Sequence, residues 1–431
     1  MSILQKTFFL LILLCGFFGL AKNSEAKSLY VATNGNDSVT YSNNDISHPW
    51  LTPQKGFYDA QAGDTVFFRG GTYTISASFG DKYNGVDGSS GSPITFKAYT
   101  GETPVFSLGS NFITDERSWY VFDGLTFNST GIALRVAYDM APSNITVKNC
   151  RFLMATGGDN WASIQINAGA SDISILNNVF VGQIYPADSH WGAGIIAFRT
   201  QGLVIKNNDI SGYVLGIYMK HSNTLADTGV EWAYNYIHDN LKGVSSVANY
   251  LHLHDNVFSG NARDIYICDD GGIGDGGLGC QHGTYSHNTA PDGVDCQEQG
   301  GGTCYHSTFT NDIFQTRNDY AAYNAETLYM SSDYNLYPTG DIVDQNRVMY
   351  DLPAWRTSNS SDAHSLSATP TFVGGSSPAT ISGFALTSGS TGHNAASDGT
   401  DMGANVSLVG PNAGQSADVT PPAAPSGLSV Q

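Results

Sequence analysis

The sequence predicts an all-β chain folded as a right-handed parallel β-helix solenoid, and three observations support this prediction. Short runs of alternating apolar and polar residues recur along the chain. Each run ends in a polar pair, often Asn-Asn, and a large apolar residue follows two places later. Alternation is typical of strands, whose successive side chains face opposite sides of a sheet, and recurrence at intervals of roughly 20–50 residues is typical of solenoids.

The large apolar residue marks one coil of the predicted solenoid. Clear copies end at Phe127, Phe152, Phe180, Ile210, Ile237 and Phe258, and weaker ones at Phe314 and Tyr337. The clear copies are 25, 28, 30, 27 and 21 residues apart. An antiparallel sandwich also repeats strands, but hairpin turns of the Asn-Gly kind are largely missing between the runs. We expect the asparagines to bond to the same residue in neighbouring coils, because an Asn ladder can form between stacked strands.

A second strand precedes the asparagine strand in each coil. Aligning these strands places Asn167, Phe198, Lys220, Val247 and Cys268 in one outward column, followed by Ala168, Arg199, His221, Ala248 and Asp269 at the strand ends. Long inserts adjoin the strands at 157–161, 185–191 and 269–279. Inserts at one level of successive coils build the walls of a groove, which in a solenoid typically binds an elongated ligand.

The ends of the chain differ in composition from its centre. Residues 1–26 contain a lysine, a short apolar run and small residues before Ala26, which predicts a signal peptide cleaved near Ala26 and hence secretion. The run is too short to span a bilayer. Residues 27–417 are the predicted solenoid, and the Pro-rich residues 418–431 are a predicted linker. We expect a monomer without membrane contact.

Charge and cysteines restrict the partners and the compartment. The formal net charge of −19 excludes bulk attraction to nucleic acid or anionic membrane, so a polyanionic ligand would need a local basic patch or a bound cation. Cys150 is predicted to be a buried small residue. Four other cysteines cluster, and in an oxidising compartment the simplest pairing is Cys268–Cys280 with Cys296–Cys304.

Both ends of the predicted solenoid carry family features. The opening contains YVATNGND at 30–37 and AGDTVFFRGGTY at 62–73, and the tail contains DAHS at 362–365 and DGTDMGA at 398–404. These segments resemble secreted bacterial β-helix proteins related to pectate lyases. The resemblance implies cleavage of an acidic polysaccharide by β-elimination, in which a base removes the C5 proton of a uronic acid and a cation or arginine holds its carboxylate.

Lys220 is the predicted base, since it lies in the groove column and a lysine beside other cations can act as a base. Arg199, one coil earlier, and His221 are the predicted charge neutraliser or acid. Similar β-helix lyases, chondroitinase B and the alginate lyases, place a Lys and an Arg on adjacent coils, although here the arginine comes first. We expect Trp161, Trp191, Tyr218 and Tyr266 to contact sugar.

Calcium is the predicted cofactor. Asp269 and Asp270, with Asp264 from the preceding strand, resemble the acidic pairs of related pectate lyases and offer the oxygen ligands that Ca²⁺ prefers. His252 and His254 both face outward on an asparagine strand and are interpreted as a surface pair rather than a zinc site.

Two other functions remain open. The first is glycoside hydrolysis by Asp264 with Asp269, or Asp269 with Asp270, if these carboxyls stand roughly 5–9.5 Å apart. The second is carbohydrate binding without catalysis.

Overall fold

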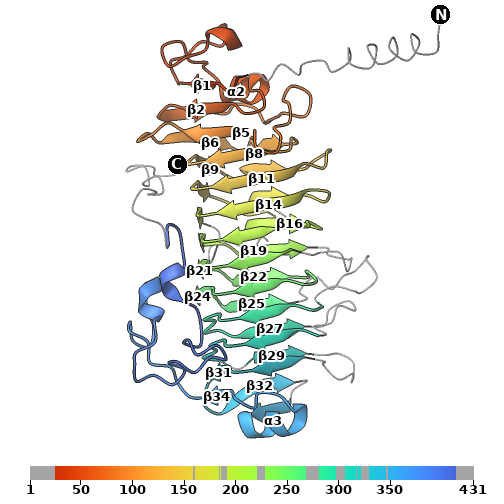
Figure 1. Ribbon diagram of the computed structural model, residues 1–431, viewed down its shortest axis with the longest axis vertical. Coiled ribbons are helices and arrows are strands. Elements are labelled where there is room, and N and C mark those ends of the chain that lie inside the picture. Colours follow the sequence, from red (N-terminus) through yellow and green to blue (C-terminus); the bar gives the residue numbers. More distant parts are fainter. Residues whose placement is uncertain are drawn as a thin grey trace, which may run out of the picture.

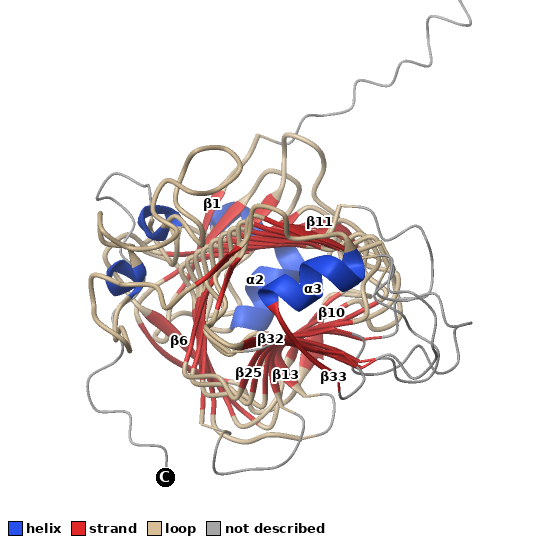
Figure 2. Ribbon diagram, turned by 90° about the horizontal axis from the view of Figure 1, so that it is seen from below, coloured by secondary structure: helices blue, strands red, loops and turns tan. Residues whose placement is uncertain are grey.

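The computed structural model describes residues 25–158, 161–183, 185, 192–220, 229–267, 281–297, 306–316, 318–321, 330–345 and 348–413. Their strands stack along one long axis (Figure 1). Seen along this axis, the sheets surround a common interior, with short helices across it (Figure 2). The predicted all-β, right-handed parallel β-helix is confirmed. The predicted signal peptide up to residue 24, the predicted linker and the boundary at 417 lie outside the described residues.

Three long sheets are built from the described coils, and sheet 2 ends at an earlier coil than the other two. Sheet 1 carries the asparagine strands: β1 (Ser28–Val31), β2 (Thr65–Phe68), β5 (Ile94–Ala98), β8 (Tyr120–Asp123), β11 (Ser143–Lys148), β14 (Ser171–Leu176), β17 (Val204–Lys206), β20 (Glu231–Ala233), β23 (His252–His254), β26 (Thr284–Ser286), β28 (Thr308–Thr310) and β30 (Ser331–Asp333). Sheet 2 carries the marker residues: β3 (Gly71–Thr74), β6 (Pro104–Gly109), β9 (Thr126–Ser129), β12 (Arg151–Met154), β15 (Val179–Gly182), β18 (Asp209–Ser211), β21 (Tyr236–His238) and β24 (Val257–Ser259).

Sheet 3 contains the second strand of each coil. Its members are β4 (Phe79–Gly80), β7 (Ile113–Asp115), β10 (Leu134–Val136), β13 (Ala162–Ile166), β16 (Ala193–Phe198), β19 (Leu215–Lys220), β22 (Lys242–Ser246), β25 (Arg263–Ile267), β27 (Val294–Gln297), β29 (Asn318–Ala321), β32 (Asp341–Gln345) and β33 (Val348–Asp351). The strands pair in parallel except for β32 with β33, which are antiparallel. The sheet-3 strand comes first in each coil and is followed by the sheet-1 and sheet-2 strands.

The marker residues form one column of the core, as predicted. Phe152 is in register with Phe127 on one side and Phe180 on the other, and Ile210, Ile237 and Phe258 continue the column. The rings of Phe127, Phe152 and Phe180 stack with centroids 4.9 and 4.8 Å apart. Each coil therefore buries its apolar residues against its two neighbours, which explains why the repeat is visible in the sequence.

The two members of each asparagine pair have different roles. The first member leaves the strand in left-handed backbone, with φ of 57° at Asn177 and 56° at Asn207. The second member is fully buried and bonds to the next coil. The side chain of Asn208 donates to the Asn235 side-chain oxygen over 3.0 Å, and Asn235 donates to Asn256 in the same way over 3.0 Å. The predicted ladder is therefore confirmed.

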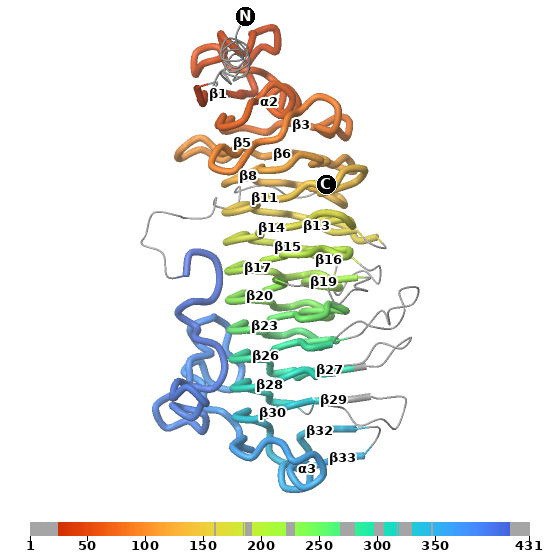
Figure 3. The backbone as a smooth tube through the Cα atoms, turned by 45° about the vertical axis from the view of Figure 1, so that its right-hand side comes forward, coloured from red at the N-terminus to blue at the C-terminus, as the bar shows by residue number. Residues whose placement is uncertain are grey.

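Helices and a returning segment close the structure. Helix α2 (Pro53–Asp59) packs beside β1 at one end, and α3 (Leu352–Asn359) packs against β33 and β32 at the other. After α3, β34 (Leu366–Ser367) pairs with β31 (Leu336–Tyr337), which precedes β32 in the chain. Residues 370–413 then run back along the outside of the coils (Figure 3). This return segment carries η2 (Ile381–Phe384) and η3 (Val406–Leu408), whereas η1 (Tyr41–Asn43) lies near the start of the chain.

The return segment bonds to sheet 1. The backbone N–H of Gly410 donates to the Tyr234 carbonyl over 2.8 Å, and that of Gly403 donates to the Asn311 carbonyl over 2.7 Å. No helix among the described residues is long and apolar enough to cross a membrane.

Cys150 is a core residue, as predicted. Its side chain is fully buried and carries a free thiol, and burial raises the pKa of this thiol to about 12. A thiol that is both buried and protonated is a poor nucleophile. Cys268, Cys280 and Cys304 lie outside the described residues, so their pairing with each other and with Cys296 stays a prediction.

We therefore expect Cys150 to resist alkylation in the native protein. Peptide mass spectrometry after iodoacetamide treatment should find Cys150 unmodified in native buffer and fully modified in denaturant. Comparable modification in both conditions would show that the coil stack opens at this level.

Candidate functional site

The outward face of sheet 3 carries a column of side chains in register across successive coils. Its members are Gln165, Ile196, Tyr218, Ser245, Tyr266 and Asp295. All six are at most 9% exposed. This face therefore offers neighbouring aromatic, hydroxyl, amide and carboxyl groups at successive levels of the solenoid.

The predicted Lys220 column lies at the far end of the same strands. Lys220 is partly buried and in register with Phe198. Arg199 is exposed, follows Phe198 directly, and has left-handed backbone with φ of 49°. The predicted Lys220 and Arg199 are thus on adjacent coils, one position apart. His221 lies outside the described residues.

Val247 departs from the expected outward column. It occupies the next level after Lys220, because its backbone N–H donates to the Met219 carbonyl over 3.2 Å. Its side chain, however, is 1% exposed and belongs to the main apolar core. Val247 is therefore a packed apolar residue and offers no accessible group to a ligand at this level.

The aromatic residues predicted to bind sugar occupy different environments. Trp161 is 42% exposed, and its ring lies over Gly131, where an added Cβ would approach it to 3.0 Å. Tyr218 and Tyr266 are on the outward column but only 6% and 8% exposed. Trp191 lies outside the described residues. Trp161 is therefore the accessible aromatic platform among the three that the structure describes.

Asp264 is not available as an open carboxylate. It is fully buried, one of its oxygens accepts from the Asn261 side chain over 3.0 Å, and the other accepts from the Asp292 backbone over 2.7 Å. Burial raises the pKa of Asp264 well above its usual value. Its carboxyl therefore joins Asn261, just before β25, to the backbone of Asp292 in the next coil. Asp269 and Asp270, the other predicted calcium ligands, lie outside the described residues.

Lys242 is a cation that the sequence analysis overlooked. It begins β22 and is in register with Arg263, which begins β25 one coil later. The Lys242 ammonium lies 3.7 Å from the ring centroid of Tyr266, and the Arg263 Nε lies 3.5 Å from a carboxylate oxygen of Asp295. Both cations stand two residues before an inward apolar position, Val244 and Ile265. Strict alternation would place them on the inner face, so the strand alignment gave no signal for them.

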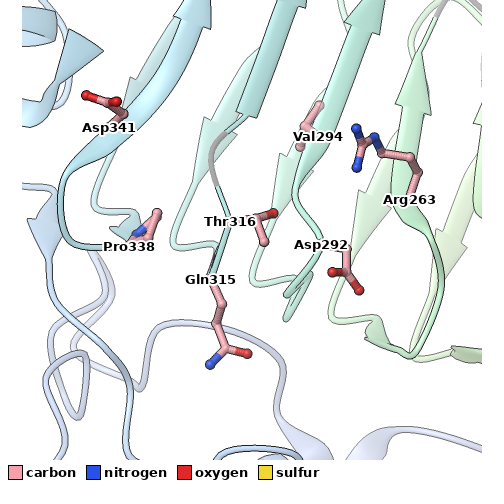
Figure 4. Close-up of a pocket in the computed structure, with 7 residues that line it drawn as sticks. All are labelled: Arg263, Asp292, Val294, Gln315, Thr316, Pro338 and Asp341. Atoms are coloured by element: carbon pink, nitrogen blue, oxygen red, sulfur yellow. The ribbon is translucent and has the colours of Figure 1, made fainter. Parts of the chain in front are cut away.

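A cavity of about 400 Å³ lies beside Arg263 (Figure 4). Its lining consists of Arg263, Asp292, Val294, Gln315, Thr316, Pro338 and Asp341. Burial raises the pKa of Asp292, and the nearby Arg263 guanidinium opposes this shift. The cavity therefore combines one guanidinium with carboxyl and amide groups, which suits a polar ligand.

A second cluster of functional side chains lies on sheet 1. Glu231 is in register with His252, and His254 stands two residues further on the same strand. One ligand atom from each of the three side chains lies within 4.8 Å of the others. The His254 Nε2 is 2.9 Å from Glu231 and its Nδ1 is 2.9 Å from Asp255. Burial lowers the pKa of His254, but hydrogen bonds to these two carboxylates outweigh it, so the net shift is upward.

Comparison with known proteins finds similarity in structure only. No protein-family model and no curated protein sequence matches the chain. A crystal structure of the pectate lyase Pel9A superposes with a TM-score of 0.53 at 14% identity, covering 88% of this chain and 96% of that one. A variant of the PL6 family alginate lyase AlyGC superposes with a TM-score of 0.51 at 11% identity, covering 87% of this chain and 59% of that one.

These superpositions establish the fold class. The chain is a parallel β-helix protein with a polysaccharide lyase-like fold. Because one fold can support unrelated activities, the fold alone does not assign the chemistry.

Proposed function

We propose that this protein is a secreted polysaccharide lyase, exported by a signal peptide cleaved near Ala26, that cleaves a uronate-containing polysaccharide by β-elimination. The observation that carries the proposal is the pairing of Lys242 with Arg263 on adjacent coils beside Tyr266. A chain with a net charge of −19 attracts a polyanion only where cations are concentrated. Lys242 and Arg263 form one such pair at the start of the sheet-3 strands, and Lys220 and Arg199 form another at their far end.

The chemistry requires a base and a group that neutralises the uronate carboxylate. Arg263 can bind the carboxylate through two parallel N–H groups, while Lys242 removes the C5 proton. Loss of the C5 proton forms the C4–C5 double bond as the C4–oxygen bond breaks, and that oxygen takes a proton from an acid.

The second assignment places the base at Lys220, with Arg199 and His221 as neutraliser and acid. Its support is that Lys220 and Arg199 lie on adjacent coils of the same sheet. Calcium remains part of the proposal through Asp269 and Asp270, whose carboxylates suit this ion. Asp264 is left out of that set because both of its oxygens are bonded within the fold.

The test of function is incubation with pectate, alginate, a glycosaminoglycan and a neutral glycan. A lyase generates unsaturated uronate ends, which absorb in the near ultraviolet. We expect absorbance to rise with at least one of the acidic polymers and not with the neutral glycan. New reducing ends without absorbance would identify the alternative hydrolase, and neither product would leave a carbohydrate-binding protein.

Two variants then locate the base. We expect Lys242→Ala to lower kcat by at least about a hundredfold, because general base catalysis typically contributes that much, and Lys220→Ala to lower it less. The matched control is Lys148→Ala, which removes an exposed lysine from sheet 1, where its Nζ is 3.8 Å from Asp123. The reverse ranking would place the base at Lys220. Wild-type rates in both variants would exclude both lysines.

A further inference from the structure

The cluster on sheet 1 lies on strands other than those of the proposed lyase site. We propose that Glu231, His252 and His254 bind a divalent transition metal of the zinc class, with Asp255 and Lys206 as positioning residues. The proposal does not depend on the lyase activity. It rests on the arrangement of five side chains from three successive coils.

The three ligand side chains share one face of sheet 1. His252 and His254 are two residues apart on β23, so both rings project from the same side of the sheet. The rings stack with centroids 4.1 Å apart and an interplanar angle of 27°. Glu231 stands opposite His252 on the preceding coil. Two imidazoles and a carboxylate are thus presented on one side, with candidate ligand atoms within 4.8 Å of each other.

The distance between the ligand atoms of His254 and Glu231 is close to the one that a bound metal ion requires. Zinc binds imidazole nitrogen and carboxylate oxygen at about 2.0–2.2 Å, so two ligand atoms on a tetrahedral ion stand roughly 3.3 Å apart. The His254 Nε2 and the nearer Glu231 oxygen are already 2.9 Å apart. His252 is exposed, so its ring can rotate to complete the set.

Asp255 and Lys206 hold two of the ligands in place. A metal-binding histidine typically donates its other ring N–H to a carboxylate, which fixes the ring and its tautomer. Asp255 is placed to accept from the His254 Nδ1 over 2.9 Å. Lys206 lies 2.7 Å from the second oxygen of Glu231, which directs the first oxygen toward His254. Glu231 and His254 are therefore oriented by Lys206 and Asp255, which need not touch the ion.

The ligand chemistry selects the class of ion. Imidazole suits zinc, copper and nickel, whereas calcium and magnesium prefer sites made of oxygen alone. Three protein ligands leave a fourth position for water, and the exposed His252 lies where solvent reaches the site. The site is therefore distinct in chemistry from the calcium ligands proposed at Asp269 and Asp270.

His238 supplies a matched comparison within the same chain. It lies between two carboxylates, with its Nε2 3.0 Å from Asp209 and its Nδ1 2.6 Å from Asp239. The neighbouring ring is Tyr236, which stacks at 4.2 Å and offers no imidazole. Contacts with two carboxylates account for the position of the His238 ring without a metal ion. The second imidazole and the shared face distinguish the His254 cluster.

The test is calorimetric titration of the untagged full-length protein, stripped with chelator, with Zn²⁺. We expect one saturable site that a hundredfold excess of Ca²⁺ does not displace. His252→Ala should weaken binding at least tenfold, and His238→Ala should leave it unchanged. Substitution with Co²⁺ should give visible absorption of a nitrogen- and oxygen-bound ion, which His252→Ala abolishes.

Three results would overturn the proposal. They are the absence of saturable Zn²⁺ binding, displacement of Zn²⁺ by Ca²⁺, or equal affinities in His252→Ala and His238→Ala. Because His252 is exposed, its substitution should leave the melting temperature of the metal-free protein unchanged. Glu231→Gln, which keeps the shape of the ligand, provides a second variant and should also weaken binding at least tenfold.

Discussion

Asp312→Asn is expected to raise the free energy of unfolding by on the order of 5 kcal/mol at pH 8. Asp312 occupies a ladder position that asparagine holds in most coils. One of its oxygens accepts from the Asn288 backbone and side chain over 2.7 and 3.0 Å. The other oxygen is buried and has no hydrogen-bond partner.

The neighbouring coils show what that second oxygen replaces. The side-chain nitrogen of Asn288 donates to the Leu253 carbonyl, and that of Asn335 donates to the Phe309 carbonyl. Tyr285 lies between Leu253 and Phe309 in the register of sheet 1. The second oxygen of Asp312 therefore takes the place of a donor to the Tyr285 carbonyl. A protonated carboxyl can donate there, whereas an ionised one cannot.

The direction of the pH dependence follows from the pKa. Burial raises the pKa of Asp312 to about 8 in the folded chain, against about 3.9 when unfolded. Below the unfolded value both states are protonated and the full contribution to stability is present. As the pH rises from about 4 to 8, only the unfolded state loses the proton, so stability falls by about 1.4 kcal/mol per pH unit. Above about pH 8 the loss levels off.

The measurement is urea unfolding of the wild type and the variant at several pH values. We expect the gap between them to open between pH 4 and 8 and to be small at pH 4. Asp172→Asn, which neutralises an exposed aspartate, is the control and should shift stability equally at all these pH values. A constant gap for Asp312→Asn would show that Asp312 does not retain its proton.

Asn235→Ala is expected to lower the free energy of unfolding by on the order of 3–5 kcal/mol, because each buried polar group left without a partner costs about 1–3 kcal/mol. The Asn235 side-chain oxygen accepts from the Asn208 backbone and side chain over 2.9 and 3.0 Å. Its nitrogen donates to the Ile205 carbonyl over 2.9 Å and to Asn256 over 3.0 Å. Alanine removes all of these bonds from a fully buried corner.

Asn235→Asp provides the sharper comparison, since it keeps the shape of the side chain. It should create a second carboxyl like that of Asp312, so its cost should grow as the pH rises. Asn43→Ala, at an exposed position in η1, is the control and should change stability by less than about 0.5 kcal/mol. A pH-independent cost for Asn235→Asp would contradict the ladder geometry.

The repeat made the fold predictable. Each coil buries its large apolar residue against those of its neighbours and bonds its corner asparagine to theirs. The positions of Phe152 and its equivalents in the sequence therefore show which residues of successive coils are in register. The strand alignment likewise placed Lys220 level with Phe198, as the structure confirms. These features are local to one coil and are repeated by the next, so they can be read from the sequence alone.

The functional clusters were predicted less completely, because they join residues of different coils. The marker spacing does place Glu231 level with His252, since each lies the same number of residues before its marker, Ile237 or Phe258. It does not show that the Lys206 and His254 side chains both reach the Glu231 carboxylate. The outward direction of the two histidines was predicted correctly, but the third ligand was not found.

The amino-acid sequence by itself determined the solenoid, its register and its asparagine ladder, since each coil repeats the same short-range alternation. Only the tertiary structure decided that Lys242 stands beside Arg263. It also decided that both oxygens of the buried Asp264 accept hydrogen bonds within the fold and that Asp312 faces a carbonyl in the buried interior. These outcomes depend on contacts between coils, on burial and on hydrogen-bond geometry, which one strand's pattern does not contain.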